Sequence, residues 1–187
     1  MTPHLTGRRD RTLNTDELEL LIPSGEIERG VRELGARLTD LYRDRQLVVI
    51  PLLKGGFMFA SDLIRAMDLD IQIEFLGAAS YGEQTRSSGE VRLTLDTTLP
   101  LAGREVLLVE DIVDTGLTLA YIQKLIKSRE PASLRTVVLL DKKVRRQVDV
   151  EVDETVFDIP DRFVFGYGLD SPGGFHRNLP GIVALKE

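Results

Sequence analysis

Apolar residues recur at helical spacing in two parts of the chain. From Ile27 to Leu41 they return every three or four positions, with Glu26 in the first turn, which predicts an amphipathic helix that begins after Ser24. A second helix is predicted from Phe57 to Met67, because the glycine pair Gly55-Gly56 ends the apolar run that precedes it. Each helix is expected to turn one apolar face toward a core.

Short continuous apolar runs separate these helices and indicate strands. Strands buried on both faces of a sheet are expected at 47–53, 106–109 and 134–140, and further strands at 71–79, 155–159 and 163–167. Residues 91–95 alternate and can pair back as a hairpin across the polar segment 82–90, which we expect to be a mobile loop. The order of elements predicts an α/β fold, a mostly parallel twisted sheet flanked by helices.

Length and composition fit one domain. The chain has 187 residues, and we expect a loose N-terminal tail at 1–15 and a single domain at 16–187. The absence of cysteine excludes disulfides and thiolate metal sites and fits a cytoplasmic location. A net charge of −6 argues against a nucleic-acid partner, and since no apolar run reaches bilayer length we expect no membrane partner.

The loop after the run at 106–109 carries the residues with the clearest chemistry. Glu110 and Asp111 supply adjacent carboxylates, which suit ribose hydroxyls or Mg²⁺. A tight turn then opens directly into an expected helix, whose start offers unpaired N–H groups and a positive dipole end to a phosphate. The candidate phosphate-binding residues are Asp114, Thr115, Gly116, Leu117 and Thr118.

Two ordinary interpretations of this loop remain open. An apolar strand that ends in Glu-Asp also occurs in two-component receiver domains, although such a domain needs roughly 100 residues after that strand, more than this chain has. Alternatively, the loop is a plain strand-to-helix turn, with Asp114 as the helix N-cap.

The sequence of this loop resembles the phosphoribosyl-pyrophosphate (PRPP) signature of the type I phosphoribosyltransferases, and most closely that of their hypoxanthine-guanine branch. The resemblance extends over roughly residues 20–187. It implies the fold of that family, with a small hood formed from the chain ends, and transfer of phosphoribose from PRPP to hypoxanthine or guanine with Mg²⁺. It also implies a homodimer or homotetramer.

The resemblance assigns roles to residues that bind the sugar phosphates. Asp114 corresponds to the residue that exchanges a proton with the purine, while Glu110 and Asp111 correspond to ribose and metal ligands. The remaining assignments are Lys54 and Gly55 in the pyrophosphate-binding loop, Ser80 and Tyr81 at the start of a catalytic flap, Asp170 as ligand of a second Mg²⁺, and Arg177 as a contact to pyrophosphate.

Three further residues match the purine-binding positions of the family. Lys142 corresponds to the donor to the purine 6-oxygen, and Phe163 and Val164 correspond to the base-stacking segment. The residues alone leave other interpretations open, because Lys142 opens a run of cations at 142–146 that is typical of a solvated surface, and Phe163 could belong to the core. The segment from Asp170 to Arg177 is one residue longer than the family pattern, and we expect His176 within it to be a surface residue.

Two other functions are compatible with the pattern. One is a regulatory protein on the same fold that binds a nucleotide or RNA, although the acidic balance argues against a basic face. The other is a phosphoribosyltransferase for another base, such as xanthine.

Overall fold

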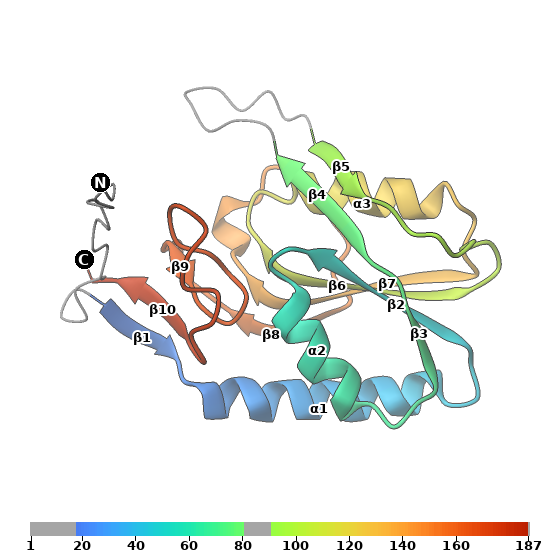
Figure 1. Ribbon diagram of the computed structural model, residues 1–187, viewed down its shortest axis with the longest axis horizontal. Coiled ribbons are helices and arrows are strands. Elements are labelled where there is room, and N and C mark those ends of the chain that lie inside the picture. Colours follow the sequence, from blue (N-terminus) through green and yellow to red (C-terminus); the bar gives the residue numbers. More distant parts are fainter. Residues whose placement is uncertain (1–17, 81–90, 187) are drawn as a thin grey trace, which may run out of the picture.

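A seven-stranded sheet forms the centre of the computed structural model, which describes residues 18–80 and 91–186 (Figure 1). The strand order is β5-β4-β2-β6-β7-β8, with β3 also paired to β2, and all pairs are parallel except β4 with β5. These strands are β2 (Leu47–Leu53), β3 (Ile71–Ile73), β4 (Leu76–Ser80), β5 (Val91–Leu95), β6 (Glu105–Val113), β7 (Ser133–Asp141) and β8 (Glu154–Asp158). The predicted α/β fold and the predicted hairpin are confirmed.

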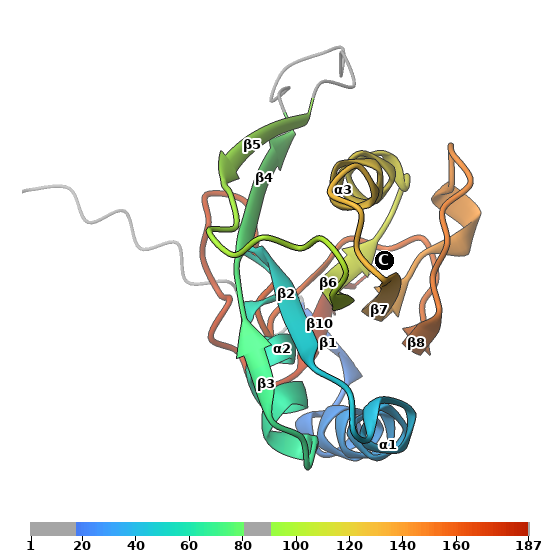
Figure 2. The ribbon, with the colours of Figure 1, turned by 90° about the vertical axis from the view of Figure 1, so that its right-hand side faces the viewer.

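Helices cover both faces of this sheet. Figure 2 shows α1 (Ser24–Tyr42) and α2 (Phe57–Ala66) on one side and α3 (Leu117–Lys127) on the other. Successive strand residues point to opposite faces, so Val49 packs toward the α1 and α2 side and Val48 toward the α3 side. This two-sided burial explains why the central strands are continuous apolar runs. Among the described helices, none is long and apolar enough to cross a membrane.

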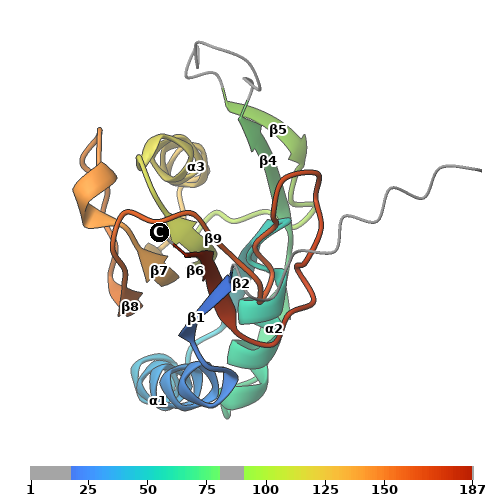
Figure 3. The ribbon, with the colours of Figure 1, turned by 90° about the vertical axis from the view of Figure 1, so that its left-hand side faces the viewer.

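The two ends of the described chain form a separate small sheet. In this hood, β10 (Ile182–Leu185) pairs antiparallel with both β1 (Leu18–Ile22) and β9 (Val164–Phe165). Figure 3 is viewed from the end that carries the hood, and the segment between β9 and β10 lies beside α2. The predicted hood is therefore present, although β1 and β10 were not expected as strands. The expected tail at 1–15 lies outside the described residues.

Three predicted element boundaries are wrong. The strand expected at 71–79 is divided into β3 and β4 at Glu74, whose N–H donates to Val49 O at 3.1 Å. The strand expected at 163–167 is only β9, because Gly166 and Tyr167 take left-handed φ values of 100° and 46°. Finally, β6 continues to Val113, so the two acidic residues lie inside the strand and do not follow it.

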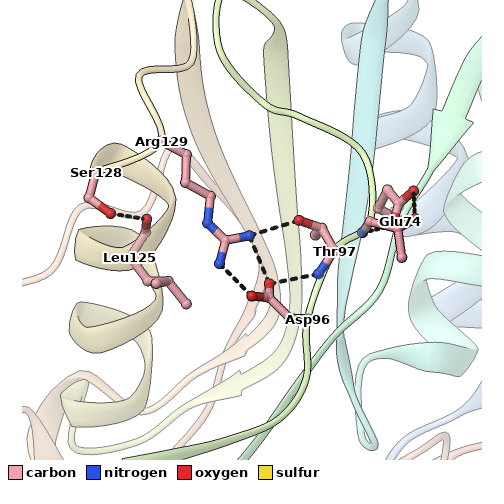
Figure 4. Close-up of polar contacts among 7 residues, drawn as sticks. Glu74, Asp96, Thr97, Leu125, Ser128 and Arg129 are labelled. Atoms are coloured by element: carbon pink, nitrogen blue, oxygen red, sulfur yellow. Dashed lines mark hydrogen bonds and ion pairs between the residues drawn. The ribbon is translucent and has the colours of Figure 1, made fainter.

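A polar cluster fixes the base of the β4–β5 hairpin (Figure 4). The Arg129 guanidinium, just beyond α3, donates to Asp96 Oδ2 at 2.8 Å and to Thr97 Oγ1 at 2.7 Å. On the other side, Glu74 accepts from the N–H of Thr98 at 3.0 Å. The hydrogen bond with Arg129 lowers the pKa of Asp96. The hairpin base is thus attached both to α3 and to the β3–β4 junction.

Candidate functional site

The turn at residues 114–118, called here the phosphate turn, joins β6 to α3. Gly116 is the N-cap of α3 with a φ of 85°, a left-handed conformation that glycine adopts without strain. At the helix start the N–H of Leu117 donates to Thr115 Oγ1 at 3.4 Å, and the N-cap position belongs to Gly116, so the interpretation of Asp114 as the N-cap is wrong. The turn borders a hollow of about 90 Å³ that is also lined by Glu110 and Leu119. N–H groups at a helix start beside a small hollow can bind a phosphate.

Glu110 and Asp111 lie side by side in β6 and are 7% and 8% exposed. Asp111 N–H donates to Glu110 Oε1 at 3.1 Å, and the N–H of Ile112 donates to Asp111 Oδ1 at 2.8 Å. Burial, followed by the neighbouring charge and hydrogen bonding of Asp111, raises the pKa of Glu110 well above its ordinary value. Two buried carboxylates this close are poorly satisfied by the protein alone, so hydroxyl donors or a cation would stabilise them.

Lys54-Gly55-Gly56, called here the pyrophosphate loop, follows β2 directly, and its first peptide bond, Leu53–Lys54, is cis. The loop is packed tightly between two other segments. A Cβ on Gly55 would lie 1.5 Å from Asp111 Oδ2, and a Cβ on Gly168 would lie 2.2 Å from the Gly55 oxygen. Only glycine fits at either position. The carboxylate pair, the pyrophosphate loop and the β9–β10 segment therefore meet at one place.

Arg177 lies at the same meeting point. It donates to the Gly168 oxygen at 2.5 Å and forms an ion pair with Asp170 Oδ1 at 2.9 Å. The longer segment between the two residues closes on itself, because Ser171 Oγ lies 2.7 Å from His176 Nδ1 and Ser171 N–H donates to the Phe175 oxygen at 3.0 Å. His176 is half-buried, with its ring centroid 5.8 Å from that of Phe165, so it is a surface residue only in part.

Lys142 differs sharply from the cations that follow it. The residue is 5% exposed, and no described residue accepts a hydrogen bond from its ammonium or forms an ion pair with it. Lys143, in contrast, is exposed and pairs with Asp158 Oδ2 at 2.8 Å. The solvated-surface interpretation therefore holds for Lys143 and is wrong for Lys142. A lysine whose stem is buried and whose ammonium has no partner among the described residues fits a place where a ligand supplies the acceptor.

The turn that begins with Lys142, called here the lysine turn (142–146), is attached to the phosphate turn. Lys142 N–H donates to the Val113 oxygen at 2.9 Å, and Gln147 N–H donates to the Thr115 oxygen at 2.9 Å. Beneath the turn, Arg146 forms an ion pair of 2.5 Å with the buried Asp141, the last residue of β7. The candidate purine donor and the candidate phosphate site therefore share one framework at the carboxyl ends of β6 and β7.

The segment before β9 closes the other side of the lysine turn. Ile159 N–H donates to the Asp141 oxygen at 3.0 Å. Phe163 is 50% exposed, with its ring 6.3 Å from that of Phe165, so the core interpretation of Phe163 is wrong. Val164 is buried in the hood. The exposed Phe163 ring is available to stack on a planar ligand.

Arg145 is a site residue that the sequence prediction missed. Its Nε lies 3.1 Å from Asp114 Oδ1, and its Nη1 lies 3.5 Å from Asp161 Oδ1. The cation run was visible in the sequence, but nothing in the run distinguishes Arg145 from its neighbours, since the contacts come from two distant segments.

The candidate flap is only partly described. Ser80 is the last residue of β4, while Tyr81 and the expected mobile loop at 82–90 lie outside the described residues. Of the β4–β5 hairpin that would carry the flap, the structure describes the two strands and the base, where Arg129 contacts Asp96 and Thr97.

Comparison with known proteins assigns this arrangement to a class. Residues 21–172 match the model of the phosphoribosyl transferase domain, and the chain belongs to that family. It is 42% identical over 172 residues to the hypoxanthine-guanine phosphoribosyltransferase of Aquifex aeolicus (strain VF5), covering 91% of this chain and 96% of the relative.

Solved structures agree with this assignment. The crystal structure of a hypoxanthine phosphoribosyltransferase from Staphylococcus aureus matches with a TM-score of 0.86 at 43% identity, covering 92% of this chain and 94% of the other. A structure from work on the C-terminal region, oligomeric state and activity of the Trypanosoma cruzi hypoxanthine phosphoribosyl transferase matches with a TM-score of 0.83 at 44% identity, covering 90% and 91%.

Proposed function

We propose that this protein transfers the 5-phosphoribosyl group from PRPP to N9 of hypoxanthine or guanine, giving IMP or GMP and pyrophosphate. The observation that carries the proposal is Lys142 beside the phosphate turn, a residue only 5% exposed whose ammonium has no partner among the described residues. In a 6-oxopurine attached to a sugar phosphate, the 6-oxygen would accept a hydrogen bond from the Lys142 ammonium. The phosphate would accept hydrogen bonds from the N–H groups of the phosphate turn. The identity of 42% and 43% to named relatives over most of both chains supports the same substrate class.

The described contacts support a consistent placement of PRPP. The 5′-phosphate would bind the N–H groups of the phosphate turn, which the hollow of about 90 Å³ leaves accessible. The ribose hydroxyls would donate to Glu110 and Asp111, which the protein leaves poorly satisfied. The pyrophosphate group would lie against Lys54 and Gly55, within reach of Arg177, because Gly168 joins those two segments.

The purine would occupy the space between the lysine turn and Phe163. Lys142 would donate to the 6-oxygen, Phe163 would stack on the ring, and Val164 would support this segment from the hood core. The bond from C1 of the ribose to the pyrophosphate oxygen breaks, and the bond from N9 to C1 forms. Pyrophosphate leaves with the bonding electron pair, and the Asp114 carboxylate would hold the purine proton.

The carboxylates also fit Mg²⁺. Among residues 18–80 and 91–186, no group of three or more candidate ligands could hold a metal ion by itself. A site with one or two carboxylates still suits Mg²⁺, because this ion is commonly held by one or two carboxylates together with substrate phosphates and water. Glu110 and Asp111 would be the protein ligands of one ion, and Asp170 would be the protein ligand of a second. When bound, the ions neutralise charge on the departing pyrophosphate.

Assembly and location are further parts of the proposal. We expect a cytoplasmic homodimer or homotetramer, and the work on the oligomeric state of the T. cruzi relative supports testing this directly. Light scattering coupled to size-exclusion chromatography would distinguish a dimer or tetramer from a monomer.

The function is tested by initial rates of IMP and GMP formation from PRPP. The wild-type protein with Mg²⁺ is expected to form both nucleotides with one pyrophosphate released per turnover. Asp114→Asn serves as the control for an enzyme contaminant, since a contaminant would be equally active in both preparations. A folded wild-type protein that forms neither nucleotide would refute the proposal.

A further inference from the structure

Arg145 connects the two sides of the proposed purine site. It is half-exposed, and its guanidinium lies between Asp114, in the phosphate turn, and Asp161, two residues before Phe163. Its own N–H donates to the Lys142 oxygen at 3.1 Å, so its backbone is fixed by the lysine turn. One residue of the lysine turn thus contacts, through its side chain, the two other segments that would surround a purine.

The contact with Asp114 is specific to one of the two carboxylate oxygens. Asp114 Oδ1 is inaccessible to solvent and accepts no directed hydrogen bond from a described residue, so the 3.1 Å ion pair with Arg145 is the interaction that holds it. The Asp114 side chain as a whole is 39% exposed. The exposed part of the carboxylate therefore remains free for a ligand, while its orientation is set by a planar guanidinium.

We infer that Arg145 is a positioning residue, which orients Asp114 for proton exchange with the purine and couples that orientation to the segment carrying Phe163. The inference rests on the proposed function, because it needs a purine whose proton Asp114 accepts. It assigns Arg145 no contact with substrate. The role differs from that of neighbouring Lys143, whose ion pair with Asp158 involves no residue of the site.

Substitution of Arg145 should change turnover more than binding. With Arg145→Gln, the carboxylate keeps its charge but loses its fixed orientation, and a misplacement of this kind lowers kcat by about 10- to 100-fold. The KM for PRPP should change little, because the Arg145 guanidinium contacts the phosphate turn at the Asp114 carboxylate and not at the N–H groups that would bind the phosphate. Arg145→Lys keeps the positive charge but lacks the planar guanidinium, so its kcat should lie between those of Arg145→Gln and the wild type. Lys143→Gln is the matched control and should retain the kcat of the wild type.

A double-mutant cycle distinguishes positioning from general support of the fold. If Arg145 acts through Asp114, adding Arg145→Gln to Asp114→Asn should lower kcat by less than about 2-fold further, since the group that it orients is already inactive. Asp161→Asn, which removes only the second ion pair, should lower kcat less than Arg145→Gln. Melting temperatures of all variants confirm that each is folded.

Three outcomes would overturn the inference. The first is fully additive effects in the cycle, which would mean that Arg145 acts independently of Asp114. The second is an unchanged kcat in Arg145→Gln, and the third is an unchanged kcat in Asp114→Asn, which would leave Arg145 nothing to position. Failure of the proposed function is distinguishable from all three, because the wild-type protein itself would then form no nucleotide.

Discussion

Replacing Lys142 by methionine removes the charge of a residue that is only 5% exposed while keeping a side chain of similar length. If the ammonium donates to the purine 6-oxygen, the substitution loses a hydrogen bond from a charged donor, worth roughly 1.5–3 kcal/mol, or about 10- to 150-fold in affinity. Because no described residue pairs with the ammonium, folding should not suffer, and the melting temperature should stay the same or rise. Lys143→Met removes an exposed cation from the same turn and is the matched control.

Calorimetric titration with two nucleotides isolates this hydrogen bond. IMP carries the 6-oxygen, whereas purine riboside 5′-monophosphate lacks it and is otherwise nearly identical. Lys142→Met is expected to bind IMP about 10- to 150-fold more weakly than the wild type does, and to bind the second nucleotide with little change. Equal losses for both nucleotides, or an equal loss of IMP affinity in Lys143→Met, would refute the assignment of Lys142 as the 6-oxygen donor.

Further perturbations test the other parts of the site and the fold. Asp114→Asn should lower kcat by about 10²- to 10⁴-fold with little change in melting temperature, since Asp114 does not cap α3; near-normal turnover of the folded variant would remove it from the catalytic role. Excess EDTA should abolish nucleotide formation and added Mg²⁺ or Mn²⁺ should restore it, whereas full turnover in EDTA would exclude the metal. The raised pKa of Glu110 means that the folded protein retains a proton that the unfolded chain has lost, so this residue lowers stability as pH rises through that window. Glu110→Gln should therefore gain melting temperature relative to the wild type as pH rises above the ordinary pKa of a glutamate, and a difference independent of pH would contradict this. Arg129→Gln should cost at most about 1 kcal/mol near neutral pH, because the pair with Asp96 is partly exposed, and the cost should disappear as pH falls through the lowered pKa of Asp96; urea titrations at several pH values measure it.

The sequence predicts the centre of the fold better than its edges. The strands β2, β6 and β7 are buried on both faces, so their apolar runs are visible without knowledge of their neighbours. In contrast, β1 and β10 lie near opposite ends of the sequence and are stabilised by pairing with each other. Neither has a local pattern that distinguishes it from a loop. The division between β3 and β4 likewise depends on contacts that no local pattern encodes.

The same distinction applies to the site. The phosphate turn can be recognised because its glycine and its position before a helix are local features. The different environments of Lys142 and Lys143 cannot be recognised from local features, since the two residues are adjacent lysines. They differ only in the folded chain, where Lys142 is buried after β7 and Lys143 pairs with Asp158. The contacts of Arg145 with two distant carboxylates are equally invisible in the sequence.

The central claim is that this site joins phosphoribose to a 6-oxopurine. It is tested most directly by incubating the purified protein with PRPP, Mg²⁺ and one free base at a time, and by quantifying nucleotide and pyrophosphate together. Hypoxanthine and guanine should each yield a nucleotide with equimolar pyrophosphate, while adenine and uracil should yield none, because neither presents an oxygen at the purine 6-position to Lys142. Nucleotide formation from adenine at a comparable rate, or from no base at all, would contradict the account.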